Sequence, residues 1–184
     1  MSKIWLTSDL HFGHDREFVW KARGFNSVEE MNEKIIENFN SVIEPDDILY
    51  LLGDCMLGNT DMDLSLINGK KIFIRGNHDT NRRVEIYKMY TDEEIKWADM
   101  IKYKKKSIYL SHHPTIVTNA GELHNLVINF FGHTHQTDNF YQNYVNMYHV
   151  GVDSHNCFPV LIDDALDAIK QKILEAKEIE NYEE

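Results

Sequence analysis

Five short apolar runs along the chain are each followed at once by residues that can bind a metal ion. The runs have the length and the aliphatic and aromatic composition of buried β-strands. They are Ile4–Leu6, Ile48–Leu52, Ile72–Ile74, Ile108–Leu110 and Leu126–Phe131. Because sites in α/β proteins form just outside the carboxyl ends of strands, the five segments predict one common site.

The hydrophobic pattern between these runs predicts helices. Ser27 and Glu30 form a capping-box signature, and apolar residues at helical spacing continue to about Val42. A second amphipathic pattern begins at Asp163 and is expected to fray into the acidic tail from Glu175 to Glu184. The remaining expected elements are a loop at Gly58–Thr60, helices at Met62–Ile67 and Arg82–Tyr90, a strand or connector at Ile95–Tyr103, and strands at Tyr144–Val150 and Val160–Ile162. This order of elements predicts a layered α/β sandwich.

Length and composition indicate an ordinary globular protein. With 184 residues, of which 42% are hydrophobic and 27% charged, the chain is expected to form one domain over residues 1–184. Its apolar runs are too short to span a bilayer, and strand-like sequence begins at the N-terminus, so neither a membrane segment nor a signal peptide is expected. Cys55 and Cys157 form no spaced metal motif and are predicted to be buried free thiols. A reducing cytoplasm is the expected location.

The charge balance bears on nucleic-acid binding. The net charge is −11, from 19 Lys and Arg against 30 Asp and Glu, which argues against broad electrostatic binding to nucleic acid. The one basic run extends from Lys102 to Lys106. A solvated turn before a strand is the favoured interpretation of this run, ahead of a nucleic-acid patch.

The residues at the strand ends provide seven oxygen or nitrogen donors. They are Asp9, His11, Asp54, Asn77, His112, His133 and His135. This is more than one first-row metal ion usually takes from a protein, but if one carboxylate bridges, the set divides into two shells of four. Two ions about 3.5–4 Å apart form a clamp for in-line displacement at phosphorus and supply a bridging hydroxide as nucleophile at neutral pH. The absence of a thiolate disfavours a structural zinc site and leaves Mn²⁺, Fe and Zn²⁺ open.

Two further histidines lie beside these donors. His78 follows Asn77, faces the same mouth and is a candidate general acid for the departing alkoxide; the alternative is that it only stabilises its loop. His14 is expected either to line the pocket, with a substrate-binding role, or to be an exposed loop residue. His149 falls within a strand-like alternation, and a structural role is favoured for it.

The five strand-end motifs, in their order along the chain, resemble those of the calcineurin-like metallophosphoesterase superfamily. They are Asp-x-His at Asp9, Gly-Asp at Asp54, Gly-Asn-His-Asp at Gly76–Asp79, Ser-His-His at Ser111–His113 and Gly-His-Thr-His at Gly132–His135. The resemblance covers most of the chain, from Asp9 to His135. It implies a four-layer α-β-β-α sandwich with two mixed β-sheets and a site for two divalent ions, with Mn²⁺ expected and Fe, Zn²⁺ or Ni²⁺ as alternatives.

Carried over to this sequence, the resemblance divides the donors into two sets. The first ion would be bound by Asp9, His11, Asp54 and His135, and the second by Asp54, Asn77, His112 and His133, so that Asp54 bridges. His78 matches the catalytic histidine of the family. Asp79 matches the acidic end of its motif and is expected to orient the loop, with a contact to substrate as a further assignment.

Departures from the family pattern narrow the expected activity. Cys55-Met56-Leu57-Gly58 follows Asp54 where Ser/Thr protein phosphatases continue Asp-Arg-Gly, which argues against protein dephosphorylation, and Ser111 stands where Gly is frequent. The chain resembles small single-domain members of bacteria and phages, many of which cleave phosphodiesters. The expected activity is therefore hydrolysis of a small or cyclic nucleotide-type phosphodiester.

Three alternatives remain open at this point. A phosphomonoesterase would use the same chemistry and would favour a neighbouring guanidinium, such as that of Arg16, Arg75 or Arg82. A nuclease rests only on the basic run and is not favoured. A non-catalytic interaction module on the same fold would be expected to lose ligands or the acid, and here none is missing.

Overall fold

The computed structural model describes residues 2–58, 62–116 and 127–183. Asn59 and Thr60 of the predicted loop, Leu126 of the predicted strand and Glu184 of the predicted tail lie outside the described residues. The strands are β1 (Ile4–Thr7), β2 (Ile48–Leu52), β3 (Lys70–Ile74), β4 (Ala98–Tyr103), β5 (Lys106–Ser111), β6 (Ile128–Phe131), β7 (Met147–His149) and β8 (Val160–Leu161). The α-helices are α1 (Glu17–Trp20), α2 (Val28–Asn40), α3 (Asn81–Tyr87) and α4 (Ile162–Glu183).

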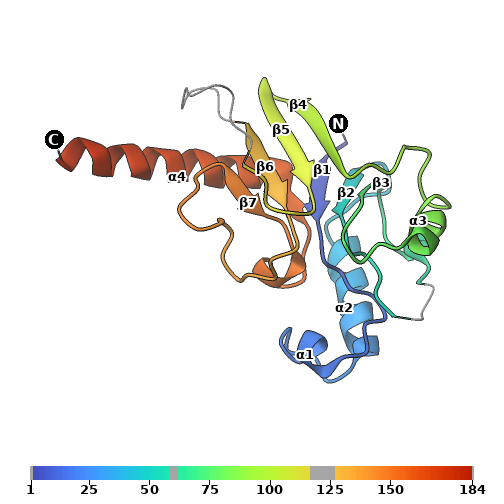
Figure 1. Ribbon diagram of the computed structural model, residues 1–184. Helices are drawn as coiled ribbons and strands as arrows, with labels where there is room; N and C mark the ends of the chain where they lie inside the picture. The colour runs from blue at the N-terminus through green and yellow to red at the C-terminus, as the bar shows by residue number, and fades with distance from the viewer. Residues whose placement is uncertain (1, 59–61, 117–126, 184) are drawn as a thin grey trace.

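The strands form two mixed sheets (Figure 1). The first has the order β3-β2-β1-β8, in which β1, β2 and β3 are parallel and β8 is antiparallel to β1. The second has the order β4-β5-β6-β7, in which β4 and β5 form a hairpin and β5, β6 and β7 are parallel. The predicted α/β sandwich with two mixed β-sheets is confirmed.

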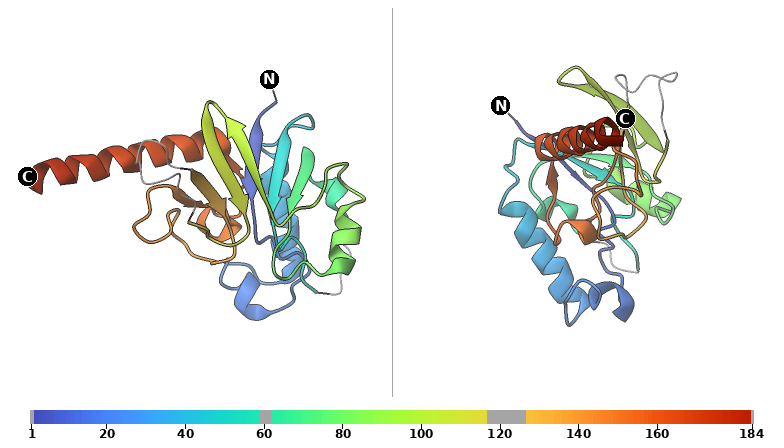
Figure 2. Two further views of the ribbon diagram at one scale, coloured as in Figure 1. Left: turned by 45° about the horizontal axis from the view of Figure 1, so that its top comes forward. Right: turned by 90° about the vertical axis from the view of Figure 1, so that its left-hand side faces the viewer.

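The first sheet is buried on both faces, as expected for parallel strands. One face packs against α1, α2 and α3 in an apolar cluster that includes Leu49, Phe73 and Met31. The opposite face joins the inner face of the second sheet in another cluster, which also takes in Ile169 and the apolar side of α4. Both faces of the first sheet are therefore packed, and α4 then projects past the second sheet (Figures 1 and 2).

Most sequence-based elements are confirmed, but the helix expected at Met62–Ile67 is only a 3₁₀-helix at Leu64–Leu66, and four other differences occur. The Oγ of Ser27 caps α2 by accepting from the backbone N–H of Glu30, but the Glu30 carboxylate accepts from Asn26, so only half of the capping box forms. The expectation that the C-terminal helix frays from Glu175 is wrong, because α4 continues to Glu183. Its Lys, Glu, Leu and Ala residues are good helix formers, which accounts for the longer helix.

The two remaining differences concern short elements. Helix α1 was not predicted, because its four residues are too few to show a helical period, and buried Val19 and Trp20 anchor it. Strand β7 is shorter than expected and begins at Met147.

Two other expectations are confirmed. Lys104 and Lys105 of the basic run form the exposed turn of the β4–β5 hairpin. Cys55 and Cys157 are buried free thiols. In the described part of the chain, no helix has both the length and the apolar character that crossing a membrane requires.

Candidate metal centre

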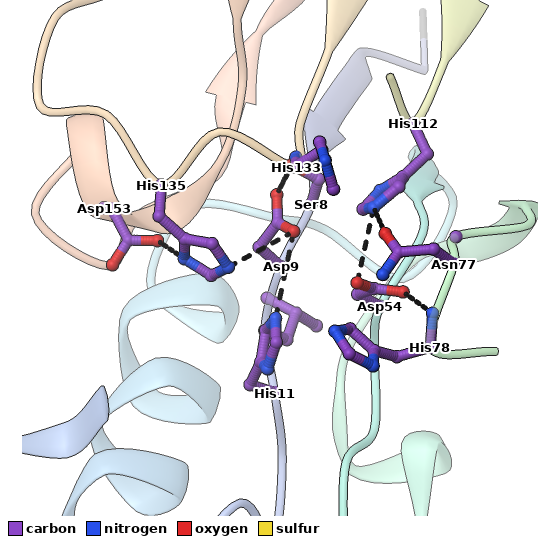
Figure 3. A network of polar contacts seen from close by, with 12 residues as sticks. Ser8, Asp9, His11, Asp54, Asn77, His78, His112, His133, His135 and Asp153 are labelled. Carbon is purple, nitrogen blue, oxygen red and sulfur yellow. Dashed lines mark hydrogen bonds and ion pairs between the residues drawn. The ribbon is translucent and has the colours of Figure 1, made fainter. Parts of the chain in front are cut away.

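The carboxyl ends of strands from both sheets meet at one place (Figure 3). Backbone hydrogen bonds join neighbouring loops there: the N–H of Asp9 donates to the carbonyl of Gly53 (3.1 Å), and that of Gly132 donates to the carbonyl of His112 (2.9 Å). The candidate ligands follow β1 (Asp9 and His11), β2 (Asp54), β3 (Asn77), β5 (His112) and β6 (His133 and His135). The structure thus brings all seven predicted donors to one edge.

The donors form overlapping groups. Asp9, His11 and His135 place their ligand atoms within 4.8 Å of one another, and so do Asp9, Asp54 and His112. The Nε2 atoms of His11 and His135 lie 3.9 and 3.8 Å from Oδ1 of Asp9. On the other side, Nε2 of His112 lies 3.3 Å from Oδ2 of Asp54. Asp9 and Asp54 are therefore adjacent carboxylates between two sets of imidazoles.

The second set differs slightly from the prediction. The Oδ1 of Asn77 lies 2.8 Å from Nε2 of His112, as expected for neighbouring ligands. A further group combines His112 and His133 with His113, which was not among the predicted ligands. The rings of His113 and His133 lie with their centroids 4.3 Å apart. His113 is thus a neighbour of the second set that the motif alone did not single out.

Hydrogen bonds to backbone and carboxylate fix the tautomers of two histidines. Nδ1 of His112 lies 2.9 Å from the carbonyl of Leu52, and Nδ1 of His135 lies 2.8 Å from Oδ2 of Asp153. Since a carbonyl or carboxylate only accepts, each Nδ1 carries the proton. Nε2 of each ring therefore faces the carboxylate of Asp54 or Asp9, and it is the nitrogen that would bind a metal ion in place of its proton.

Unsatisfied buried atoms show that these residues fit a cation. Oδ1 of Asp9 and Nε2 of His11 are buried and have no hydrogen-bond partner among the residues that the structure describes. The other carboxylate oxygen of Asp9 accepts from the Ser8 hydroxyl (2.6 Å) and the His133 backbone N–H (2.8 Å). Buried polar atoms are rarely left unpaired, and a divalent ion would satisfy both atoms at once. The donors are oxygen and imidazole nitrogen, which suits the ions expected from the sequence.

The histidines keep the carboxylates ionised. Burial alone would raise the pKa of Asp9, but the neighbouring imidazoles of His11, His112 and His135 and the hydrogen bond from Ser8 outweigh it, so that the pKa lies well below its ordinary value. Burial would also raise the pKa of Asp54, but the hydrogen bond from His112 outweighs burial. The pKa of Asp54 therefore lies below its ordinary value. Both groups are therefore anionic at neutral pH and ready to bind a cation.

The backbone of the site is strained. Asp9, His11, Asp54, His133 and His135 all have positive φ, between 48° and 67°. The left-handed region costs residues with a Cβ of the order of 1–3 kcal/mol each. Five of the seven candidate ligands share this conformation, so the surrounding structure holds them there against a local cost.

Asp79 holds two ligand loops together. Its buried carboxylate accepts from the backbone N–H groups of Asp54 (2.9 Å) and Gly76 (2.7 Å) and from the hydroxyl of Tyr87 (2.7 Å). The expected role in orienting the loop fits this position. A contact with substrate does not, because the carboxylate is 2% exposed and its oxygens are engaged within the protein. We therefore assign Asp79 to positioning only.

His78 and His14 line a cavity of about 580 Å³ at the metal centre, together with His11. The exposed ring of His78 meets that of His11 edge-on, with centroids 5.9 Å apart, and its backbone N–H donates to Oδ1 of Asp54 (2.9 Å). His14 stacks on His11 with centroids 5.4 Å apart. Of the two interpretations for His14, the structure favours the cavity wall. His149 lies in the core, where its Nδ1 contacts the Ser154 hydroxyl, in keeping with a structural role.

Sequence reasoning missed two residues that support the site. Asp153, in the short 3₁₀-helix after β7, binds Nδ1 of His135 and forms a two-point ion pair with Arg23 at 2.8 and 3.0 Å. The guanidinium also donates to the carbonyls of Asp9 (2.7 Å) and Leu10 (3.0 Å). The rule that found the other strand ends could have found Asp153, because it follows a sixth strand. Nothing in the sequence marks Arg23.

Comparison with known proteins decides the family. Residues 2–154 match the profile of the calcineurin-like phosphoesterase superfamily domain. The chain belongs to this superfamily. The predicted resemblance is thus confirmed, and membership supports a hydrolase of phosphoesters with candidate metal ligands at the strand ends.

Individual relatives are similar to part or most of this chain. An uncharacterized protein of Methanocaldococcus jannaschii, MJ1445, is 45% identical over 84 residues, and the gene 66 protein of Mycobacterium phage L5 is 36% identical over 86 residues. Each match covers 43% of this chain, and the matches span 48% and 41% of those relatives, so less than half of their length is shared. A solved structure of a protein of unknown function from Aquifex aeolicus, AQ665, matches with a TM-score of 0.65 and 25% identity, covering 87% of this chain and 95% of that one.

Proposed function

We propose that the protein is a dinuclear metal-dependent phosphodiesterase that hydrolyses a small or cyclic nucleotide-type diester. The observation that carries this proposal is the pair of adjacent carboxylates, Asp9 and Asp54, with imidazole donors on both sides and two unsatisfied buried ligand atoms, on Asp9 and His11. In the proposal the first ion is held by Asp9, His11, Asp54 and His135, and the second by Asp54, Asn77, His112 and His133. Mn²⁺ is the expected ion at both positions.

The metal ions, when bound, would polarise the phosphoryl oxygens and supply hydroxide for attack at neutral pH. The protein's own contribution is to orient the ligands. Asp153 and the Leu52 carbonyl hold His135 and His112 in the tautomers that direct Nε2 inward. Asp79 keeps the Asp54 loop against the Gly76 loop. This arrangement lets the site form with little reorganisation when substrate arrives.

His78 is the proposed general acid. Its ring is exposed at the cavity and borders His11, while its backbone is tied to the proposed bridging residue Asp54. A proton on the ring would be transferred to the oxygen of the departing group as the bond to phosphorus breaks. The hydrogen bond to Asp54 supports this role, because it holds the backbone of His78 beside the metal site.

The charge of the cavity favours a diester over a monoester. Among the described residues that line it, the one guanidinium belongs to Arg23, which is 3% exposed and paired with Asp153. Arg75, a candidate phosphate ligand from the sequence, instead binds the Asp79 carbonyl and covers Trp97. A monoester dianion would gain more from an extra cation than a diester monoanion does.

A reducing cytoplasm, in keeping with the two buried free thiols, is part of the same proposal.

The test compares bis-p-nitrophenyl phosphate with p-nitrophenyl phosphate, using Mn²⁺-reconstituted and metal-free protein. We expect hydrolysis of the diester well above that of the monoester, and none without metal. A reversed ratio would make the protein a phosphomonoesterase. If two metal ions bind and neither ester is cleaved, a non-catalytic module becomes the better description.

A further inference from the structure

The cavity beside the metal centre has two chemically different walls. One carries the candidate ligands His11 and His135 together with His78. The other is apolar and is formed by Phe18, Leu57 and their neighbours. The volume of about 580 Å³ lies within the usual range for small-molecule sites and exceeds what a phosphate group needs. Chemistry at the first wall therefore leaves room for a substituent against the second.

Phe18 is the most prominent residue of the apolar wall. Its side chain is 73% exposed, whereas the next two residues of α1, Val19 and Trp20, are buried and fix the helix. An exposed phenylalanine by itself says little about function. Here the ring lines the cavity and meets the edge of the His14 ring at a centroid distance of 5.7 Å, with an angle of 88° between the planes.

A row of rings leads from Phe18 to the metal centre. Phe18 contacts His14, and His14 stacks on His11, a candidate metal ligand. Leu57, from the loop after Asp54, lines the same cavity. A flat group attached to a metal-bound phosphate would therefore meet aromatic and aliphatic surface on leaving the metal site.

We propose that Phe18, His14 and Leu57 form a subsite for a planar ring carried by the phosphoester substrate. The inference rests on the proposed function for the position of the phosphate and deepens it by naming the substrate class. Aromatic side chains bind flat π-systems by stacking and tolerate different ring types. A nucleobase and a simple aryl group share this chemistry, and the experiment separates them.

The test measures binding of phosphonates, which this chemistry does not hydrolyse, to the Mn²⁺-loaded protein by calorimetry. Methylphosphonate reports the metal centre alone, and phenylphosphonate adds a ring. We expect the phenyl compound to bind about tenfold more tightly, which corresponds to ~1.4 kcal/mol. Phe18→Ala should remove most of this difference and leave methylphosphonate unchanged. A nucleoside 5′-phosphonate serves as the third ligand. If its affinity exceeds that of phenylphosphonate, and falls further in Phe18→Ala, the ring is identified as a nucleobase.

Phe158→Ala is the matched control. This phenylalanine is 38% exposed and lines a second cavity of about 610 Å³, which shares Asp153 with the first and is not lined by Phe18. It should not change the preference for the ring. An equal effect at Phe158, or equal binding of both phosphonates to the wild type, would overturn the subsite while leaving the metal site standing. If methylphosphonate does not bind in a metal-dependent manner, the proposed function fails and the subsite fails with it.

Discussion

Asp153 offers a sharp test of how the site is organised, because it lies outside the proposed ligand shells yet touches both a ligand and a buried cation. In Asp153→Asn the side chain keeps its shape and can still accept from Nδ1 of His135, but it loses its charge. Carboxylate partners of metal-binding histidines typically contribute 10- to 100-fold to metal affinity. We therefore expect Mn²⁺ affinity at the position served by His135 to fall by about that factor, or ~1.4–2.7 kcal/mol.

The same substitution should lower stability, and for a separate reason. The side chains of Arg23 and Asp153 are 3% and 15% exposed, so their ion pair is largely buried. Removing one partner of a buried pair costs about 3–5 kcal/mol. Arg23 retains the carbonyls of Asp9 and Leu10, so we expect a loss of roughly 2–3 kcal/mol, or about 5–10 °C in Tm for a chain of this size.

The direction in which the pKa of Asp153 is shifted decides the pH at which the prediction is tested. Burial would raise its pKa, but the hydrogen bonds to His135 and Arg23 outweigh burial and bring the pKa below the ordinary value of 3.8. A carboxyl group whose pKa is lowered in the folded state stabilises the fold. This contribution is fully present above the pKa of the unfolded state and is lost as the pH falls through the pKa of the folded state. Experiments at pH 7 therefore measure the whole contribution.

Calorimetric titration of apo protein with Mn²⁺ separates the two effects. In Asp153→Asn the affinity for one equivalent of Mn²⁺ should fall, while the affinity at the other position, served by His112, stays unchanged. Arg23→Ala serves as the comparison, since it should lower Tm but leave the Asp153–His135 contact and most of the metal affinity. Asp46→Asn, at a side chain that is 94% exposed, should change neither. Equal weakening of both equivalents, or of neither, would refute the reasoning.

Four further predictions concern the ligands, the acid and their support. Asp54→Asn should abolish binding of both equivalents of Mn²⁺, and a variant that still takes up two would contradict the bridging role. His78→Ala should keep both ions but lose about 10²–10⁴-fold in rate on diesters with poor leaving groups; retained rate would make His78 structural. Tyr87→Phe removes a hydrogen bond to buried Asp79 and should cost ~1–3 kcal/mol in chemical denaturation without changing metal stoichiometry, whereas no loss would show that water replaces the hydroxyl. Chelation of the metal should leave the far-UV circular dichroism unchanged, whereas chelation unfolds a domain built on a structural zinc site. Unfolding on chelation would disprove this prediction.

The sequence predicted the centre of the site because strand ends are local features. A buried strand followed by Asp, Asn or His can be seen within a few residues, and parallel strands bring such ends to one edge. Asp9, Asp54 and His112 were found in this way, although they are far apart along the chain. Asp153 obeys the same rule and was missed because the sequence between it and β7 contains no familiar motif.

Long-range supporting contacts could not be predicted in this way. Arg23 and Asp153 are 130 residues apart, and their pairing depends on how the turn after α1 and the 3₁₀-helix after β7 lie in three dimensions. His113 joined the second set of imidazoles for a similar reason, because its position depends on the turn before Pro114. The error at the C-terminus was different: acidic composition suggested fraying, but helix propensity prevailed in α4.

The strained backbone and the hydrogen bonds at the site have one explanation in common. Asp9 occupies a left-handed conformation, and its Oδ2 accepts from Ser8 and His133, so that Oδ1 alone is left for a cation. Asp54 is also left-handed, and Asp79 holds its backbone N–H. In these two residues the costly conformation is thus accompanied by buried carboxylate hydrogen bonds within the protein. Because the protein itself supplies these bonds, the ligands are positioned before any metal arrives, and the free energy of metal binding is not needed to order them.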